Sequence, residues 1–566
     1  MDKTLIINPK TKWYKDAVVY QIYPRSFCDT NGDGIGDLRG IISKLDYIKS
    51  LGVNAIWLSP IYKSPNDDNG YDISDYRDIM DEFGTLDDFK EMLKGMHDRG
   101  IKLIMDLVVN HTSDEHKWFL ESKKSKDNPY RDYYIWRDGK GKNPPNNWAS
   151  NFVGPAWEYD KTTDQYYLHL FSKKQPDLNW ENPKVRQEVA DICNYWFDLG
   201  VDGFRCDVIT YISKVDGLPD GNFFKDFPLK GQHQYVMGPR YHEYMHELNQ
   251  RAFGRYDSMT VGEAAGITFK DAFKSIDESV EELDSVFTFE HVNADMYMQV
   301  FPHKLNLPKW KKILSNWQTL PLTSQPTLFL ENHDQPRSWP RFVMYEEGNR
   351  DLACKMLLVA MQMMRGTAYV YQGQEIGMTN IKLKDEEYID IMATRIFGTI
   401  KKSAPFLMPI ARNAMAKRAR DHARTPMQWD DSELTGFTTG KPWMLINPNH
   451  VDINVKKQDK DEDSILNFYR KFISFRIGKD IIISGTYIPY YEKSKSLFVY
   501  ARVLGKKAYF TICNFKNKEI DFKIPSDLKF KASSVAITNY KEPISQTLVD
   551  RKIAPFEAVV YELELE

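Results

Sequence analysis

The sequence predicts an α/β protein: a (β/α)8 TIM barrel with an inserted subdomain after the third strand and a C-terminal antiparallel β-domain. Three observations predict this fold. Eight short apolar runs end in polar residues, helical-looking segments separate them, and a late segment alternates apolar with polar residues.

The eight predicted strands are similar in length, and most close on a polar or acidic residue. They are VVYQIYP (18–24), AIWLSP (55–60), KLIMDLV (102–108), GFRCDV (203–208), MTVGE (259–263), VFTFE (286–290), LFLENHD (328–334) and TAYVYQGQE (367–375). Between them, segments such as DLRGIISKLDYIKSLG place apolar residues at helical spacing and end on glycine. Repeated strand-then-helix units favour a closed parallel barrel.

Strand spacing also predicts the domain organisation. The gap between the third and fourth strands is about twice its neighbours and rich in Asn, Pro, Trp and Tyr, so residues 113–182 are expected to form an inserted subdomain B. The barrel would then comprise residues 1–112 and 183–485. Short alternating runs over 486–566 predict a C-terminal β-sandwich domain.

Composition limits the classes of molecule that the protein is expected to bind. Lys and Arg total 76 against 79 Asp and Glu, which disfavours nucleic acid or anionic lipid as a ligand. The segment MDKTLIINPKTKWYKD lacks the apolar core of a signal peptide, and no long uncharged apolar run predicts a membrane span. Five scattered cysteines indicate a reducing compartment. We therefore expect a cytoplasmic monomer with a neutral small-molecule substrate.

Acidic residues recur where the predicted strands end. In a barrel of this type the reactive groups lie at that rim. A single acid there usually caps a helix, but several acids on one rim would repel each other in a merely structural site. The set therefore favours a functional site: Asp106, Asp207, Glu263, Glu290 and Asp334.

Arg205 and Asp207 are two residues apart in one predicted strand, so their side chains should point to the same side. The guanidinium would keep the carboxylate ionised, as a nucleophile requires; a purely structural ion pair is the alternative. Glycoside hydrolysis with retention needs an ionised carboxylate and a protonated carboxyl about 5 Å apart. Asp207 and Glu263 end successive strands and are the candidates.

Four segments resemble the signature regions of the α-amylase superfamily: DLVVNH (106–111), GFRCDV (203–208), VGE (261–263) and ENHD (331–334). Further segments resemble those of oligo-1,6-glucosidases, also called isomaltases. They are VVYQIYPRSF, NGDGIGDLRGIISKLDY, SPNDDNGYDISDY, HLFSKKQPDLNW, YQGQEIGMTN and ARTPMQWD.

This resemblance implies that Asp207 is the nucleophile, that Glu263 is the acid and base, and that Asp334 binds the sugar hydroxyls and distorts the ring. It implies that Asp72 and Arg424 grip the far end of the terminal glucose, which makes cleavage exo-acting. The implied substrate contacts are Asp72, His111, Phe171, Gln175, Arg205, Val208, His333 and Arg424. The expected activity is hydrolysis of terminal α-1,6-linked, and possibly other α-linked, glucose from short oligosaccharides such as isomaltose.

The preference for one glycosidic linkage depends on a few positions near the leaving group. The resemblance associates Val208 with α-1,6 links, although a methyl-sized change in a subsite is worth only about 1–3 kcal/mol. Simple strand packing is the alternative reading of Val208. The sequence departs from the family pattern at Ala264, Ala265 and Glu331, which bears on the subsite for the leaving group.

The loop DTNGDGIGD (29–37) predicts a structural Ca2+ site. Oxygen donors alternate along it, and Gly34 permits a sharp turn. The donors would be Asp29, Asn31, Asp33, the carbonyl of Ile35, and Asp37. The loop is not a full EF-hand, because its twelfth position is Gly40. A turn with solvated acids is the alternative, and no catalytic metal is expected.

Other functions remain open. A sucrose isomerase or transglucosidase, forming trehalulose or isomaltulose, would share the nucleophile and the acid, but PRSWPRF (336–342) fits hydrolases better than its arginine-rich loop. Trehalose-6-phosphate hydrolase is also similar, yet the sequence has no obvious added basic cluster for a phosphate. A non-catalytic barrel, as in amino-acid-transporter heavy chains, is disfavoured by the retained carboxylates.

Overall fold

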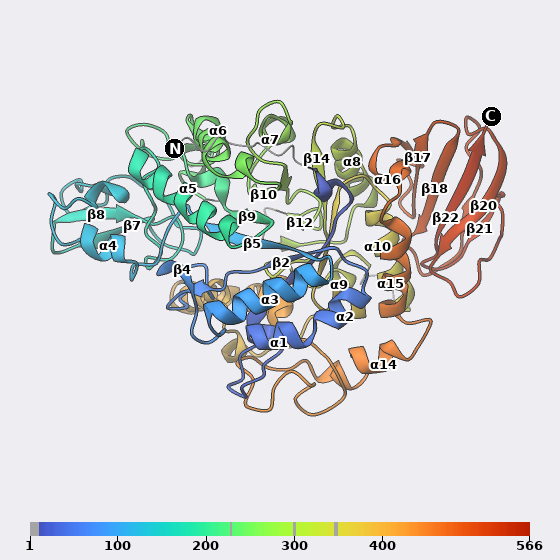
Figure 1. The fold of residues 1–566 in the computed structure, drawn as a ribbon, viewed down its shortest axis with the longest axis horizontal. Coiled ribbons are helices and arrows are strands. Elements are labelled where there is room, and N and C mark those ends of the chain that lie inside the picture. Colours follow the sequence, from blue (N-terminus) through green and yellow to red (C-terminus); the bar gives the residue numbers. More distant parts are fainter. Residues whose placement is uncertain (1–10, 223, 227–228, 298–300, 344–348) are drawn as a thin grey trace.

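The computed structural model describes residues 11–566 except 223, 227–228, 298–300 and 344–348. Most of the N-terminal segment considered for a signal peptide thus lies outside the described residues. A central barrel carries a small subdomain at one end and a β-domain at the other (Figure 1). Within the described ranges, every helix is too short or too polar to cross a membrane.

Eight parallel strands close into the barrel in the order β1-β15-β14-β11-β10-β9-β5-β2, which confirms the predicted fold. They are β1 (Val18–Ile22), β2 (Ala55–Leu58), β5 (Lys102–Val108), β9 (Gly203–Asp207), β10 (Met259–Glu263), β11 (Ser285–Phe287), β14 (Gln325–Leu328) and β15 (Thr367–Tyr371). The seventh strand was predicted too far along the chain. β14 ends at Leu328, and the polar ENHD segment lies in the loop that follows.

Helices surround the barrel, and most of them bury one apolar face. The larger ones are α3 (Leu86–Asp98), α5 (Pro183–Asp198), α6 (Tyr241–Arg251), α8 (Leu307–Gln318) and α10 (Arg350–Gln362). In α3, Phe89, Met92 and Met96 recur at helical spacing and are buried. Thr85 begins this helix with a capping box, in which its side chain accepts from Asp88 N–H.

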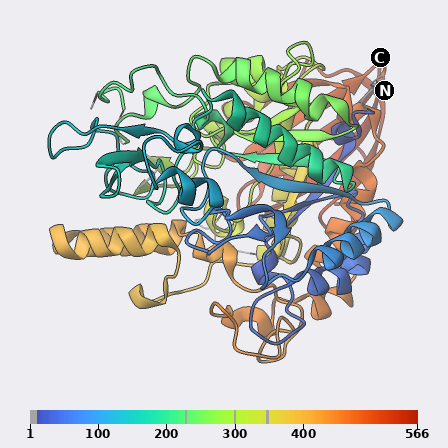
Figure 2. The same ribbon diagram turned by 60° about the vertical axis from the view of Figure 1, so that its left-hand side comes forward.

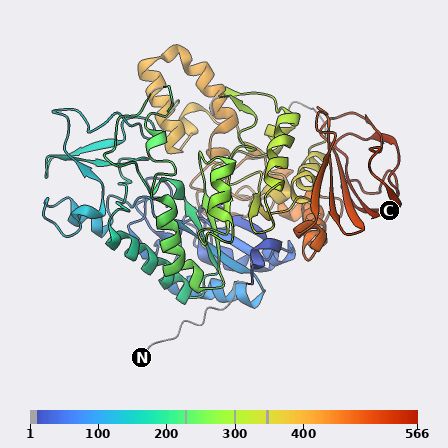
Figure 3. The same ribbon diagram turned by 90° about the horizontal axis from the view of Figure 1, so that it is seen from above.

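Two elaborations rise beside the catalytic end of the barrel. Residues 113–182 contain α4 (Lys117–Ser122) and the three-stranded sheet β6 (Trp136–Arg137), β8 (Gln165–Leu168) and β7 (Trp157–Asp160). After β15, α11 (Ile391–Ser403) and α12 (Met408–Arg418) form a projecting helical pair, gold in Figures 2 and 3. Arg395 of α11 donates to the carbonyl of Phe152 at 3.2 Å, so the pair contacts the inserted subdomain.

The C-terminal domain is antiparallel, as predicted. Its main sheet has the order β16-β17-β18-β22-β20, and β19 pairs with β21. The bounds are β16 (Thr486–Tyr490), β17 (Leu497–Leu504), β18 (Lys507–Asn514), β19 (Ile520–Phe522), β20 (Phe530–Thr538), β21 (Arg551–Ile553) and β22 (Ala558–Leu565). Trp310 of α8 is 0 % exposed and meets Phe498 and Phe515 edge-on, with ring centroids 5.9 and 5.7 Å away. This domain therefore shares a core with the barrel.

We predict that Trp310→Ala lowers the free energy of unfolding by about 3–5 kcal/mol, because it leaves a cavity between two domains. Urea denaturation followed by circular dichroism measures the change. Phe406→Ala is the control: that ring is 78 % exposed, and its loss should change stability by less than about 0.5 kcal/mol. Equal losses in the two variants would contradict the shared core.

Candidate active site

Arg205 in β9 gathers three carboxylates from neighbouring strands. Its side chain is 2 % exposed, and Nη1 donates to Oδ1 of Asp106 at 2.6 Å and to Oδ1 of Asp207 at 2.7 Å. Nη2 donates to Oε2 of Glu263 at 2.6 Å. Arg205 and Asp207 thus lie on one side of the strand, as their spacing predicted. The strand order β5-β9-β10 brings all three acids to one guanidinium.

This cation offsets the cost of burying the acids. Burial raises the pKa of Asp207 well above its usual range, and the charge of Arg205 opposes that rise. Burial likewise raises the pKa of Asp106 to about 6, against the charge of Arg205 and hydrogen bonds from Trp57 and Tyr71. Arg205 therefore favours the ionised form of Asp207.

The backbone after the nucleophile is strained. Val208 has φ 35° and ψ 38°, a left-handed conformation that a β-branched residue rarely adopts. Its N–H donates to Oε2 of Glu263 at 3.2 Å. The strained turn thus contributes to orienting the second carboxylate. The Val208 side chain packs in a buried cluster with Tyr211, against which Phe171 also packs.

His333 and Tyr71 form one wall of the site. Their rings stack with centroids 5.3 Å apart and an interplanar angle of 4°. His333 pairs through Nε2 with the Tyr71 hydroxyl at 2.7 Å and through Nδ1 with Gln21 at 2.8 Å. Burial lowers the pKa of His333 to about 3, so the ring stays neutral at physiological pH.

Asp334 lies beside this wall and is partly exposed, with 26 % of its side chain accessible. Its Oδ1 accepts from Arg424 at 2.8 Å and from Arg420 at 3.2 Å. Although burial opposes ionisation, the interaction with His333 and the charges of Arg420 and Arg424 hold the pKa of Asp334 below its usual range. Asp334 is therefore an anion whose Oδ1 is held by two arginines, and its Oδ2 lies 3.2 Å from Nε2 of His333.

The structure changes the assignment of Asp72. This residue is 0 % exposed, and its carboxylate accepts from the Ser64 hydroxyl at 3.0 Å and from the N–H groups of Asp67 and Asp68 at 2.8 and 3.0 Å. It closes its own loop instead of facing the pocket. Asp68, four residues earlier, accepts from Arg420 at 3.1 Å and takes the place that the sequence gave to Asp72.

His111, Phe171 and Gln175 lie together on a further side of the site. Nε2 of His111 is 3.2 Å from Nε2 of Gln175 and 3.1 Å from the carbonyl oxygen of Tyr71. The Phe171 ring lies 5.1 Å from the imidazole, measured between centroids. The segment 169–180 therefore brings the inserted subdomain into contact with His111 and Tyr71.

The expectation for Glu290 was wrong. It follows β11 by three residues and accepts from the indole N–H of Trp317 at 3.2 Å, outside the carboxylate group on Arg205. Conversely, sequence reasoning missed Asp68, Arg420 and Asp390. Arg420 and Asp68 could have been found because each lies four residues before a residue that the resemblance selected. No comparable signal marks Asp390.

The 29–37 loop uses its acids to fold itself. Asp29 Oδ1 accepts from Asn31 and Gly32 N–H at 2.9 and 2.8 Å, and Asp33 accepts from Ile35 N–H at 2.8 Å. Asp37 caps α1 (Leu38–Ser43) through Gly40 N–H at 2.6 Å. Among the residues described, no three His, Cys, Asp or Glu side chains form a metal-holding group. The donor types suit Ca2+, while the side chains also serve as turn caps.

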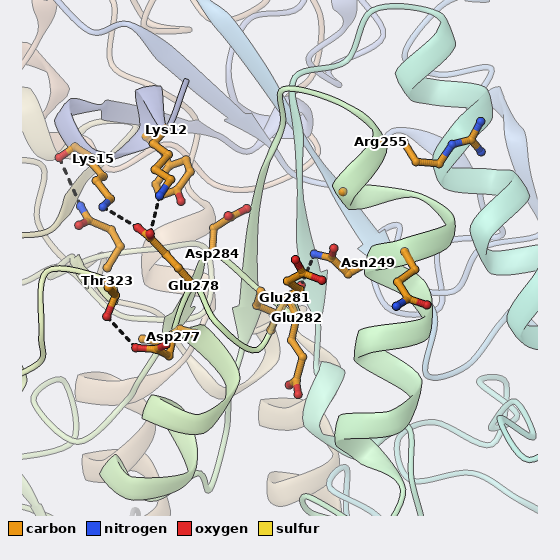
Figure 4. Close-up of a pocket in the computed structure, with 16 residues that line it drawn as sticks. Lys12, Lys15, Asn249, Arg255, Asp277, Glu278, Glu281, Glu282, Asp284 and Thr323 are labelled. Carbon is orange, nitrogen blue, oxygen red and sulfur yellow. Dashed lines mark hydrogen bonds and ion pairs between the residues drawn. The ribbon is translucent and has the colours of Figure 1, made fainter. Parts of the chain in front are cut away.

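A cavity lies elsewhere, at the opposite end of the barrel. It measures about 470 Å³, and its lining includes Tyr14 and Lys15 before β1, and Asp284 before β11. Figure 4 shows Lys12 and Lys15 directed at Glu278, to which both are paired. The N-terminal face of such barrels serves stability. This cavity is therefore not the catalytic site.

The site is that of a glycoside hydrolase: paired carboxylates at the C-terminal rim of a barrel, with a further anion fixed beside them. The model of the α-amylase catalytic domain matches residues 21–485. Oligo-1,6-glucosidases of Parageobacillus thermoglucosidasius and Bacillus cereus are 52 % and 48 % identical, each over 98 % of this chain and 99 % and 100 % of theirs. This chain belongs to the α-amylase family of glycoside hydrolases.

Solved structures agree on the fold. Trehalose-6-phosphate hydrolase of Bacillus licheniformis superposes with a TM-score of 0.91 at 44 % identity, over 98 % of this chain and 100 % of the other. The isomaltulose synthase of Protaminobacter rubrum gives a TM-score of 0.93 at 40 % identity, over 98 % and 99 %. One architecture thus serves several reactions on sugars, and the substrate must be argued from the site.

We predict that Arg205→Gln lowers kcat/KM by roughly 10²- to 10³-fold. The lost cation leaves burial unopposed, so the pKa of Asp207 rises further. A higher pKa leaves less ionised nucleophile at low pH, and the acidic limb of the pH profile of kcat/KM should move to higher pH. Arg205→Lys keeps the charge and should move that limb less. An unmoved limb in Arg205→Gln would contradict the role of the cation.

Proposed function

We propose that the protein is a retaining, exo-acting α-glucosidase that releases terminal α-1,6-linked glucose from short oligosaccharides such as isomaltose. The observation that carries the proposal is the guanidinium shared by Asp207 and Glu263. Two carboxylates on one guanidinium fit the close spacing of a retaining pair, about 5 Å, better than the wider spacing of an inverting pair.

In this mechanism Asp207 attacks the anomeric carbon while Glu263 protonates the leaving oxygen. The aglycone departs, and a covalent glucosyl-enzyme remains. Glu263, now ionised, takes a proton from water, which attacks the same carbon and frees Asp207. Asp334 binds the ring hydroxyls and favours the distorted ring of the transition state. Retention follows from two inversions at one carbon.

Exo-action is supported by the charged end of the pocket. Asp68, Arg420 and Arg424 form a buried ion-pair group with Asp334, which supports a pocket closed beyond the terminal glucose. The α-1,6 preference is supported by Val208 and by two relatives named oligo-1,6-glucosidase. Val208 supplies an apolar surface close to both catalytic acids.

Hydrolysis is favoured over sucrose isomerisation by the arginines that follow His333 and Asp334. Arg337 is fully buried and donates to Glu331 at 3.1 Å, and Arg341 pairs with Asp295 at 2.9 Å. Neither guanidinium is free to hold a released sugar for recapture. Glu331, a departure from the family pattern, thus has a structural partner in Arg337.

We predict that Asp207→Asn and Glu263→Gln fold normally but hydrolyse isomaltose several orders of magnitude more slowly. Thermal melting checks the fold, and glucose release checks the rate. Near-normal turnover by either variant would refute the assignment of the two roles.

The products of the wild-type enzyme test the substrate. Isomaltose, maltose, sucrose, trehalose and panose are compared, and the anomer of the released glucose is followed by NMR. Free α-glucose from isomaltose supports the proposal. Isomaltulose from sucrose, or β-glucose as the first product, would contradict it. Faster cleavage of trehalose-6-phosphate than of isomaltose would point to the phosphosugar hydrolase instead.

We also propose that the 29–37 loop binds a structural Ca2+ through Asp29, Asn31, Asp33, the Ile35 carbonyl and Asp37. Its support is the all-oxygen donor set on a tight loop. Chelation with EDTA should lower the melting temperature, and added Ca2+ should restore it. Asp33→Ala should abolish this response; an identical response in that variant would contradict the site.

We also propose a cellular location and an oligomeric state. A cytoplasmic location is supported by the five cysteines, all buried and unpaired, as expected of a protein kept in a reducing compartment. A monomer is proposed as its working state, and sedimentation equilibrium tests it directly.

A further inference from the structure

Asp390 is a buried acid behind the sugar-binding end of the pocket. It is 2 % exposed and stands immediately before α11. Its two oxygens have different partners. Oδ1 accepts from Met392 N–H at 3.0 Å and caps the helix. Oδ2 accepts from Nε of Arg420 at 2.8 Å and from Nη1 of Arg424 at 3.1 Å.

The two arginines carry like charges and converge on one oxygen of Asp334. Each uses a different nitrogen for Asp390 than for Asp334: Arg424 donates through Nη1 and Nη2, and Arg420 through Nε and Nη1. Like charges this close repel in a buried site unless anions bracket them. Asp390 supplies a counter-charge shared by both guanidinium groups.

We propose that Asp390 is a positioning residue of the glucosidase site, which holds Arg420 and Arg424 so that they fix the Asp334 carboxylate against the sugar hydroxyls. The arginines hold Oδ1 of Asp334, and Oδ2 lies 3.2 Å from Nε2 of His333, so a shift of the arginines would turn the whole carboxylate. The inference rests on the sugar-binding role proposed for Asp334. It also ties the α11–α12 pair to the pocket, since the same residue caps α11.

A helix cap alone is the competing explanation, and the two oxygens allow a separation. Asn is as good an N-cap as Asp. Asp390→Asn therefore keeps the cap of α11 and removes the charge that faces the arginines. Asp421→Asn is a matched control: Asp421 is a buried acid in the same region that accepts from the N–H groups of Ile389 and Asp390 at 2.9 and 3.1 Å.

The test compares kcat/KM on p-nitrophenyl α-glucoside and on its 2-deoxy analogue. In Asp390→Asn we expect kcat/KM on the parent substrate to fall about 100-fold, which is the scale expected when a group of the site is misplaced. The ratio between the two substrates should also fall severalfold, because bonds to the 2-hydroxyl strengthen in the transition state. This ratio does not depend on the fraction of enzyme that is folded.

Each outcome decides the inference. A reduced ratio in Asp390→Asn with the wild-type ratio in Asp421→Asn supports it. A wild-type ratio in Asp390→Asn, whatever the loss of rate, overturns it and leaves a helix cap. An equal reduction in both variants also overturns it. Failure of the wild-type enzyme to cleave the parent α-glucoside would instead contradict the proposed function.

Discussion

The guanidinium of Arg205 is the interaction on which the rest of the site depends. Three carboxylates from three neighbouring strands meet on it in a buried environment, where unpaired anions would be costly. The cation offsets the cost of holding Asp207 and Glu263 close together. Barrel closure makes this possible, because it sets β5, β9 and β10 side by side with their ends at one rim.

A second charged group supports the opposite side of the pocket. Here Asp68, Asp334 and Asp390 alternate with Arg420 and Arg424, and each arginine contacts more than one acid. The members come from four separate segments of the chain, around residues 68, 334, 390 and 420–424, and Asp390 begins the α11–α12 pair. The pocket is thus built from the barrel rim and from the two elaborations that rise beside it. Its geometry depends on how those elaborations dock.

The comparison with isomaltulose synthase and trehalose-6-phosphate hydrolase shows how little of the fold needs to change between reactions. At a TM-score above 0.9 the backbone is shared. Reaction choice must then reside in individual side chains near the rim. In this chain one such side chain near the rim, Arg337, is engaged by Glu331.

The sequence by itself predicted the barrel, because the strand period and the glycine-closed helices are local patterns. Alternation along β9 also placed Arg205 beside Asp207. Only the tertiary structure decided that Asp68, and not Asp72, faces the arginines, since two acids in one tight turn differ only in direction. The tertiary structure also decided that Asp390 lies beside these arginines and that Glu290 lies away from Arg205. An ion-pair partner 30 residues away along the chain, as Arg420 is to Asp390, leaves no periodic trace in a sequence.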